Sequence, residues 1–258
     1  MNSIEKNNIL VNKFKAVPVR MYGFKPEKTK LAVFDFDETL VQSQDMFFEL
    51  NAEAMIMLNL PCTKEIVENI FNKWDKEYLG WGKNLEEQKE IYRTKFTPLV
   101  TKLSNDAYFI NKMKFFEGMK ETIKQLAKTD IALAIASSRD LHSILKFLQK
   151  EEVRDCFEMV EATEGGRNYK DKPHPAIVYY IAQEIGIPIE RSVMIGDSPN
   201  DIKMGKNAGM KTIAVGYGKY ANREKLYNEN PDDFISFTDR ICFVNHVKEI
   251  LDFDIQYF

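Results

Sequence analysis

Short apolar runs alternate with amphipathic stretches along most of the chain. Buried strands are predicted at 30–34, 131–136, 159–161, 192–195 and 212–215. The spacing of apolar residues elsewhere predicts helices at 119–128, 141–150, 175–185 and 200–208. Strands that alternate with helices form right-handed βαβ units, so we expect a parallel sheet covered by helices on both faces. Segments 232–237 and 245–251 are expected to add one strand and a closing helix.

The pattern changes between residues 44 and 116, where no strand is predicted. Amphipathic stretches at 45–58, 64–78 and 85–100 predict helices, the last with a buried stripe of Leu85, Ile91, Tyr92 and Phe96. The chain therefore divides into an N-terminal extension (1–29), an α/β core (30–43 and 117–258) and an inserted helical cap (44–116). The predicted fold class is α/β: a doubly wound, Rossmann-like parallel sheet with a helical cap over the carboxyl ends of its strands, where ligands bind in such folds.

The composition is that of an ordinary globular protein, and it limits the partners. The 258 residues include 36 Lys and Arg against 39 Asp and Glu, and this net charge of −3 gives no sign of a nucleic-acid polymer as partner. No apolar run reaches the roughly 20 residues of a membrane-spanning helix. Three scattered cysteines, Cys62, Cys156 and Cys242, argue against a disulfide framework or a cysteine-based zinc site. We expect a cytoplasmic monomer or homodimer, although the basic N-terminal extension leaves organelle targeting open.

The strongest chemical signal follows the first predicted strand, in the sequence Phe34-Asp35-Phe36-Asp37. Alternate residues of a strand point to the same face, so we expect Asp35 and Asp37 to project together while the phenylalanines face the other way. Two carboxylates at the carboxyl end of a strand suit Mg²⁺, which prefers hard oxygen ligands. One can act as a nucleophile while the other moves a proton. The alternative is an ordinary polar exit from the strand.

A second acidic segment, residues 196–201, follows another predicted strand. Ser198 and Pro199 have the pattern of an N-cap and a first helical residue. Asp197 is then expected in the loop and Asp201 in the first turn, where both can face the same cation as the first pair. Asp201 has the alternative of merely complementing the helix dipole.

Phosphate-binding groups are predicted in two further segments. Ser137 and Ser138 follow the 131–136 strand, and a hydroxyl beside free N–H groups at a helix N-terminus is a ready phosphate site. Ser138 has the alternative of an ordinary N-cap. Lys172 opens the rigid sequence Lys-Pro-His-Pro, where it can neutralise phosphate oxygens and keep Asp35 ionised. A single lysine is usually only solvated, so this signal depends on the others.

The order of these segments resembles that of the haloacid dehalogenase superfamily of phosphatases and phosphotransferases. The resemblance covers about residues 30–218 and is closest to the branch with a helical cap after the first strand. That branch includes phosphoglycolate phosphatase and beta-phosphoglucomutase. The sequence from Lys172-Pro173 through residues 196–201 to Ala208-Gly209-Met210 matches it closely.

The resemblance implies a role for each candidate residue. Asp35 would attack phosphorus and form an aspartyl-phosphate, and Asp37 would protonate the leaving oxygen and then activate water. Ser137 and Lys172 would hold the phosphoryl oxygens. The implied activity is hydrolysis of a small phosphomonoester such as a sugar phosphate, phosphoglycolate or a nucleotide.

The resemblance also implies a Mg²⁺ site. Its ligands would be the Asp35 carboxylate, the Asp37 backbone carbonyl and the Asp197 carboxylate, with Asp201 in support. Positioning and charge neutralisation supply most of the catalysis in phosphoryl transfer, so these groups match the demands of the reaction.

Two departures from the family pattern stand out. Glu38 occupies a position where the family often has Gly, and Ser138 one where it frequently has Asn, which weakens one expected phosphate or substrate contact. The presence of Asp37 argues against carbon–halogen cleavage, because the true dehalogenases of the superfamily lack this second acid.

Two other functions remain open beside hydrolysis. A phosphomutase would return the phosphoryl group to a sugar hydroxyl, and a regulatory protein would keep the fold without turnover. Substrate choice is expected to depend on the cap, near Trp81, Lys83 and Arg93. Trp81, between two glycines, suits stacking on a base or sugar, and its alternative is a core anchor at a helix–helix turn. The alternative for Lys83 is plain solvation.

Overall fold

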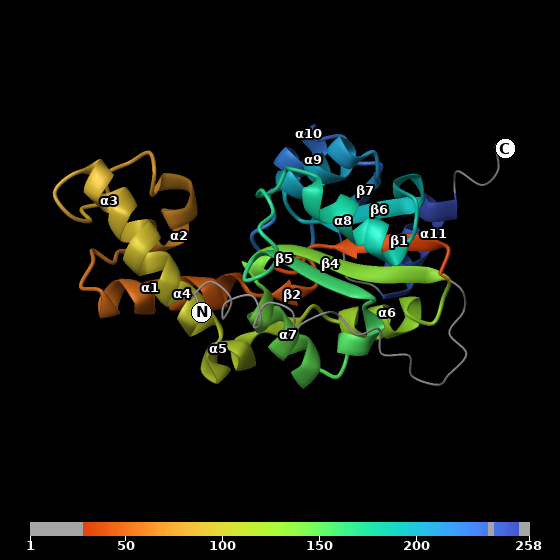
Figure 1. Ribbon diagram of the computed structural model, residues 1–258, viewed down its shortest axis with the longest axis horizontal. Coiled ribbons are helices and arrows are strands. Elements are labelled where there is room, and N and C mark those ends of the chain that lie inside the picture. The colour runs from red at the N-terminus through yellow and green to blue at the C-terminus, as the bar shows by residue number, and fades with distance from the viewer. Residues whose placement is uncertain (1–27, 237–239, 253–258) are drawn as a thin grey trace, which may run out of the picture.

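A six-stranded parallel sheet, with helices on both faces, forms the centre of the molecule (Figure 1). This computed structural model describes residues 28–236 and 240–252. The strand order is β5-β4-β1-β6-β7-β8. The strands are β1 (Lys30–Phe34), β4 (Ile131–Asp140), β5 (Met159–Glu164), β6 (Ser192–Gly196), β7 (Lys211–Val215) and β8 (Asp233–Ile235). From β1 the sheet grows through β4 and β5 on one side and β6 to β8 on the other, which confirms the doubly wound α/β prediction.

Alternate residues of the central strands supply two hydrophobic layers. In β1, Ala32 and Phe34 belong to one layer, whereas Leu31 and Val33 belong to the other. Helices α6 (Met119–Leu126), α7 (Leu141–Lys150) and α11 (Arg240–Asp252) pack on the first face, and α8 (Ala176–Ile185) and α9 (Pro199–Ala208) on the second. Burial on both faces explains why these strands are continuous apolar runs rather than alternating ones.

Five α-helices lie between residues 44 and 112, to one side of the sheet in Figure 1. They are α1 (Gln44–Met57), α2 (Lys64–Lys73), α3 (Leu85–Ile91), α4 (Thr97–Ser104) and α5 (Ala107–Lys112), and we call residues 44–112 the helical insert. An antiparallel pair, β2 (Val41–Gln42) and β3 (Lys114–Phe115), joins its two ends. The sequence pattern predicts neither this pair nor α5, because elements this short carry no periodic signal.

The helical insert has two hydrophobic parts. Met46 and Leu50 of α1 join the cluster under the first face of the sheet, together with Phe109 of α5. Trp81 and Phe96 instead belong to a separate cluster within the insert. The near end of the insert is therefore fixed to the core, and its far end has a small core of its own.

Two predicted helices are shorter or less regular than expected. α2 ends at Lys73 rather than Tyr78, and the side-chain amide of Gln88 donates to the carbonyl oxygens of Trp74 (2.8 Å) and Glu77 (2.7 Å) beyond that end. The 85–100 stretch contains a π-helical turn at Tyr92–Phe96. The first turn of α4 follows directly, and it contains a proline, which cannot donate a backbone hydrogen bond. In the predicted stripe, Phe96 is buried, whereas Leu85, Ile91 and Tyr92 are half-buried.

β4 is longer than the apolar run that predicts it. It continues through Asp140, with Ser137 paired to Ala162 of β5 and an irregularity in register beyond it. The N-cap of α7 is consequently Asp140, whose side chain accepts from the backbone N–H of Ser143. Neither Ser137 nor Ser138 lies at the helix N-terminus, so the N-cap alternative for Ser138 is wrong.

The two chain ends differ from the predicted boundaries. Residues 1–27 of the predicted extension lie outside the described residues, but Lys28 and Thr29 pack on the core. Lys28 Nζ donates to the carbonyl oxygens of Ala127, Thr129 and Ile131, just beyond the end of α6. The last two elements are β8 and α11, and α10 (Arg223–Asn228) lies between β7 and β8. Residue 237 of the predicted last strand lies outside the described residues.

Candidate active site

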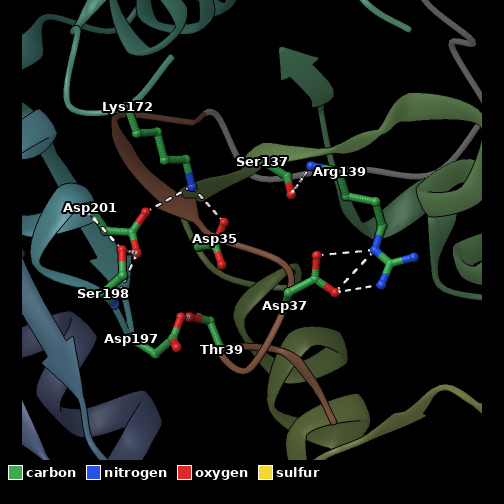
Figure 2. A network of polar contacts seen from close by, with 9 residues as sticks. All are labelled: Asp35, Asp37, Thr39, Ser137, Arg139, Lys172, Asp197, Ser198 and Asp201. Atoms are coloured by element: carbon green, nitrogen blue, oxygen red, sulfur yellow. Dashed lines mark hydrogen bonds and ion pairs between the residues drawn. The ribbon is translucent and has the colours of Figure 1, made fainter. Parts of the chain in front are cut away.

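Asp35 and Asp37 lie directly after the end of β1, at the carboxyl edge of the sheet (Figure 2). The backbone N–H of Asp35 still donates to Ile195 O in β6 (2.8 Å), which holds this segment in the sheet. Phe34 and Phe36 are fully buried in the core, as the alternation predicts. The two carboxylates share the site but turn to different partners, Asp35 to Lys172 and Asp37 to Arg139.

Lys172 bridges two carboxylates from different strands. Its Nζ donates to Asp35 Oδ1 (2.5 Å) and to Asp201 Oδ1 (2.7 Å), and its side chain is 7% exposed. Burial raises the pKa of Asp35 to about 7 even though Lys172 opposes the shift. Burial lowers the pKa of Lys172, but Asp201 and Asp35 outweigh it, so the pKa is raised and the ammonium stays charged. Lys172 thus contacts Asp35, but the expectation that it keeps Asp35 ionised is not met by the lysine alone, because burial outweighs its effect on the pKa.

The segment after β6 brings Asp197 and Asp201 to the same place. Ser198 is the N-cap of α9, its hydroxyl donates to Asp201 Oδ2 (2.7 Å), and the two residues form a capping box. Gly196 is necessary for this approach, because a Cβ there would lie 2.3 Å from the Asp201 Cβ. Asp197 Oδ1 accepts from the Thr39 hydroxyl (3.1 Å). Burial, together with Asp35 and Asp201, raises the pKa of Asp197 well above its usual range.

Three carboxylates form a candidate cation site. Among the described residues, Asp35, Asp197 and Asp201 each offer an oxygen atom, and these atoms lie within 4.8 Å of one another. Such hard oxygen donors, with more negative charge than Lys172 alone neutralises, fit a divalent cation. The Asp37 carboxylate is not part of this group, since it is bound to Arg139.

Ser137 and Ser138 have different environments. Ser137 is 1% exposed, and its Oγ accepts from the backbone N–H of Arg139 (3.2 Å), close to Asp35 in Figure 2. Ser138 is exposed. The structure therefore brings Ser137, and not the Ser138 side chain, into the polar network of the site.

Arg139 is the main site residue that the sequence reasoning misses. Its buried guanidinium donates to Asp37 Oδ1 from Nη2 (2.8 Å) and from Nε (3.0 Å), and Nε also reaches Oδ2 (3.0 Å). The signal that could have found it is the period-two spacing of Ser137 and Arg139 at a strand end, the same spacing that points to Asp35 and Asp37.

Glu38 supports the start of the helical insert. Its backbone has a positive φ of 55°, and its Oε1 accepts from the N–H groups of Ser43 and Gln44 (2.8 Å each). These N–H groups lie at the free N-terminus of α1, so the carboxylate acts as a cap for that helix. The departure from the family pattern at this position therefore serves the connection to the insert.

The three candidate substrate residues of the insert are not brought to the carboxylates. Trp81 has no exposed surface and packs on Phe96 with ring centroids 5.0 Å apart, which agrees with the core-anchor alternative. The guanidinium of Arg93 lies 5.4 Å from the ring centroid of Trp74. Lys83 is exposed beside α3, and α3 lies on the side of the insert away from the sheet in Figure 1.

Comparison with known proteins identifies one family. Residues 32–215 match the family model described as haloacid dehalogenase-like hydrolase. A pyrophosphatase, PpaX, of Halalkalibacterium halodurans is 32% identical over 72% of this chain and 82% of its own length. A phosphoglycolate phosphatase of Photorhabdus laumondii is 27% identical over 82% of this chain and 90% of its own. The solved structure of a haloacid dehalogenase-like hydrolase from Streptococcus pneumoniae superposes with a TM-score of 0.63 at 16% sequence identity. The superposition covers 84% of this chain and 98% of the other chain, and it supports the fold.

Proposed function

The chain belongs to the haloacid dehalogenase-like hydrolase family, and on this basis we propose that it is a Mg²⁺-dependent phosphatase that hydrolyses a small phosphomonoester through an aspartyl-phosphate. The observation that carries the proposal is the buried cluster in which Lys172 joins Asp35 to Asp201, with Asp197 beside them. In such a cluster the carboxylate can attack a phosphoryl group, the fixed ammonium can neutralise its oxygens, and the further acids can hold the cation that accompanies it.

In the proposed first step, Asp35 Oδ2 attacks phosphorus and the bond to the leaving oxygen breaks. Asp37 gives its proton to that oxygen, so the product leaves as an alcohol. Lys172 Nζ and the Ser137 hydroxyl hold the phosphoryl oxygens. In the second step water attacks the phosphorus of the aspartyl-phosphate, Asp37 takes a proton from the water, and Asp35 is released with inorganic phosphate.

The acidic cluster would hold the metal. The ligands would be the carboxylates of Asp35 and Asp197 and the backbone carbonyl of Asp37, and Asp201 would support them through Lys172 and Ser198. When bound, Mg²⁺ neutralises negative charge on the phosphoryl oxygens and on Asp35. Burial and the neighbouring acids raise the pKa values of Asp35 and Asp197, and a bound cation would oppose this shift by favouring their ionised forms.

The names of the relatives support a small substrate. Phosphoglycolate phosphatase and pyrophosphatase both describe enzymes that act on compact phosphorylated anions. We propose phosphoglycolate as the candidate phosphomonoester. Inorganic pyrophosphate is the alternative substrate because the pyrophosphatase relative is 32% identical; it is a phosphoanhydride, so its leaving group would be phosphate instead of an alcohol. The net charge of −3 provides no general attraction for anions, so Lys172 and the metal must supply it locally.

The helical insert would act as a cap over the site. Its helix α4 reaches the carboxyl ends of β4 and β5, where Asn105 Nδ2 donates to Asp140 Oδ1 (2.7 Å) and the Thr101 hydroxyl bonds Glu164. Contacts with these two strand ends place α4 beside the catalytic edge, where a closing motion would exclude bulk water.

None of the helices in the described ranges is long and apolar enough to cross a membrane. We propose a cytoplasmic enzyme that works as a monomer or homodimer. The three scattered cysteines of the chain, Cys62, Cys156 and Cys242, suit a reducing compartment. Cell fractionation and size-exclusion chromatography would test the two statements.

The test of the proposed activity is hydrolysis of p-nitrophenyl phosphate with Mg²⁺, followed by phosphoglycolate and pyrophosphate. Asp35→Asn and an excess of EDTA should each abolish turnover, whereas Asp155→Asn, an exposed acid in the turn before β5, should not change it. Full activity in EDTA would contradict the metal requirement, and activity in Asp35→Asn would contradict the nucleophile.

A further inference from the structure

Arg139 connects the proposed proton-transfer residue to the helical insert. Its side chain is 1% exposed. The guanidinium lies 4.3 Å from the ring centroid of Phe47 in α1 and 5.7 Å from that of Phe36 (Figure 2 shows its bonds to Asp37). A cation enclosed by aromatic faces and a strand end has little freedom to move, so it is a rigid support for whatever it binds.

Each nitrogen atom of this guanidinium faces a protein group. Nε and Nη2 donate to Asp37, and Nη1 donates to Ser143 Oγ (3.5 Å). The phosphoryl oxygens of a substrate are therefore left to Ser137 and to Lys172, whose ammonium lies with Asp35 and Asp201. Arg139 acts on Asp37 rather than on the phosphate.

The hydrogen bonds to Asp37 are unequal. Oδ1 accepts two, at 2.8 and 3.0 Å, whereas Oδ2 accepts only one, at 3.0 Å, from the Nε that it shares with Oδ1. A carboxylate oxygen has two acceptor positions, so Oδ2 keeps the capacity to exchange a proton while Oδ1 fixes the plane of the group. The Asp37 side chain is 24% exposed, so without Arg139 it could turn into solvent.

We propose that Arg139 is a positioning residue, which holds Asp37 through Oδ1 so that Oδ2 exchanges the proton with the leaving oxygen and with water. The inference rests on the proposed function, in which Asp37 moves that proton. Phe47 keeps water from the guanidinium, and it ties this orientation to α1, the first helix of the insert.

Two aryl phosphates of nearly the same shape test this role. Phenyl phosphate and p-nitrophenyl phosphate differ in the nitro group, which stabilises the departing anion and reduces its need for a proton. Their kcat/KM values report the step in which Asp35 is phosphorylated and the leaving oxygen departs. A defect in proton donation therefore lowers kcat/KM for phenyl phosphate more than for p-nitrophenyl phosphate, whereas a folding defect lowers both equally.

Arg139→Met keeps an unbranched side chain similar to the aliphatic part of arginine and removes the guanidinium donors. We expect kcat/KM for phenyl phosphate to fall about 10–100-fold, because a general acid that is wrongly oriented loses part of its catalytic effect. The kcat/KM for p-nitrophenyl phosphate should stay within about threefold of wild type. Arg139→Lys should recover part of the loss, because it restores the charge without the planar fork. Arg154→Met is the matched control, since Arg154 Nη1 donates to Phe157 O (2.8 Å) before β5, at the opposite end of that strand from the site.

A double variant separates this inference from the proposed function. Asp37→Asn should show the same preference for the better leaving group, and Arg139→Met added to it should cause no further loss. Equal losses for both substrates in Arg139→Met, or a full additional loss in the double variant, would overturn the positioning role. If wild type hydrolyses neither substrate, or if Asp37→Asn affects both equally, the proposed function fails instead.

Discussion

Removal of the nucleophile's charge should stabilise the metal-free protein. Asp35 is buried beside two other acids, and Lys172 compensates them only in part, so burial raises its pKa from the ordinary 3.8 to about 7. In Asp35→Asn the carboxamide stays neutral at every pH, and its oxygen can still accept from Lys172 Nζ. The variant therefore lacks the cost of ionisation that the wild type bears.

The size of the effect follows from the pH interval. Below pH 3.8 the carboxyl group is protonated in both the folded and the unfolded protein, so no difference arises. As pH rises, the unfolded chain ionises first, and the free energy of unfolding falls by about 1.4 kcal/mol per pH unit until the folded group also ionises. Over the interval from 3.8 to about 7 the loss is at most about 4 kcal/mol, and it remains constant at higher pH.

Thermal unfolding in EDTA at pH 5 and pH 8 measures this difference. For a protein of this size each kcal/mol moves Tm by about 2–4 °C, so Asp35→Asn should melt several degrees above wild type at pH 8 and by a smaller margin at pH 5. Asp130→Asn is a control of opposite sign, because Thr29 and Lys30 outweigh burial there and lower the pKa of Asp130. A melting temperature of Asp35→Asn below that of wild type at pH 8 would mean that the ion pair with Lys172 outweighs the cost of burial, contrary to this prediction.

Three further predictions concern Mg²⁺ binding, the contact between Gly196 and Asp201, and the role of Trp81 in the helical insert. Mg²⁺ should raise the Tm of wild type more at pH 8 than at pH 5, because Asp35 and Asp197 have raised pKa values and bind the cation only when ionised. If Mg²⁺ raised the Tm of Asp197→Asn as much as that of wild type, this would contradict the proposed metal site. Gly196→Ala should lower kcat and cost about 1–3 kcal/mol in urea unfolding, because its Cβ would meet Asp201, and wild-type behaviour would contradict that contact. Trp81→Phe should reduce stability by about 1–3 kcal/mol and leave KM unchanged, since Trp81 is a core residue; a raised KM with unchanged stability would make it a substrate contact.

The fold was predictable because its central strands are buried on both faces. Continuous apolar runs such as β1 and β6 are visible without any structure, and the polar residues directly after them mark the carboxyl edge of a parallel sheet. The same reasoning brings Asp35, Asp197 and Asp201 together, because their strands are neighbours. The site was predictable where it depends on strand ends.

Side-chain partners across the fold were not predictable in the same way. The pairing of Asp37 with Arg139 joins residues 102 positions apart, and nothing in either local sequence indicates which carboxylate the guanidinium selects. The continuation of β4 past its apolar run depends on backbone pairing with β5, which moved the N-cap of α7 to Asp140. Short elements such as β2 and β3 depend on tertiary contacts rather than on a pattern.

The most direct measurement is detection of the covalent intermediate. The enzyme is mixed with a ³²P-labelled phosphomonoester and Mg²⁺, quenched in acid and digested, and the labelled peptide is sequenced. We predict a hydroxylamine-sensitive label on Asp35 that is absent in Asp35→Asn and accumulates in Asp37→Asn, where water is no longer activated. Turnover of the substrate with no label on Asp35, or with undiminished rate in Asp35→Asn, would contradict the aspartyl-phosphate mechanism.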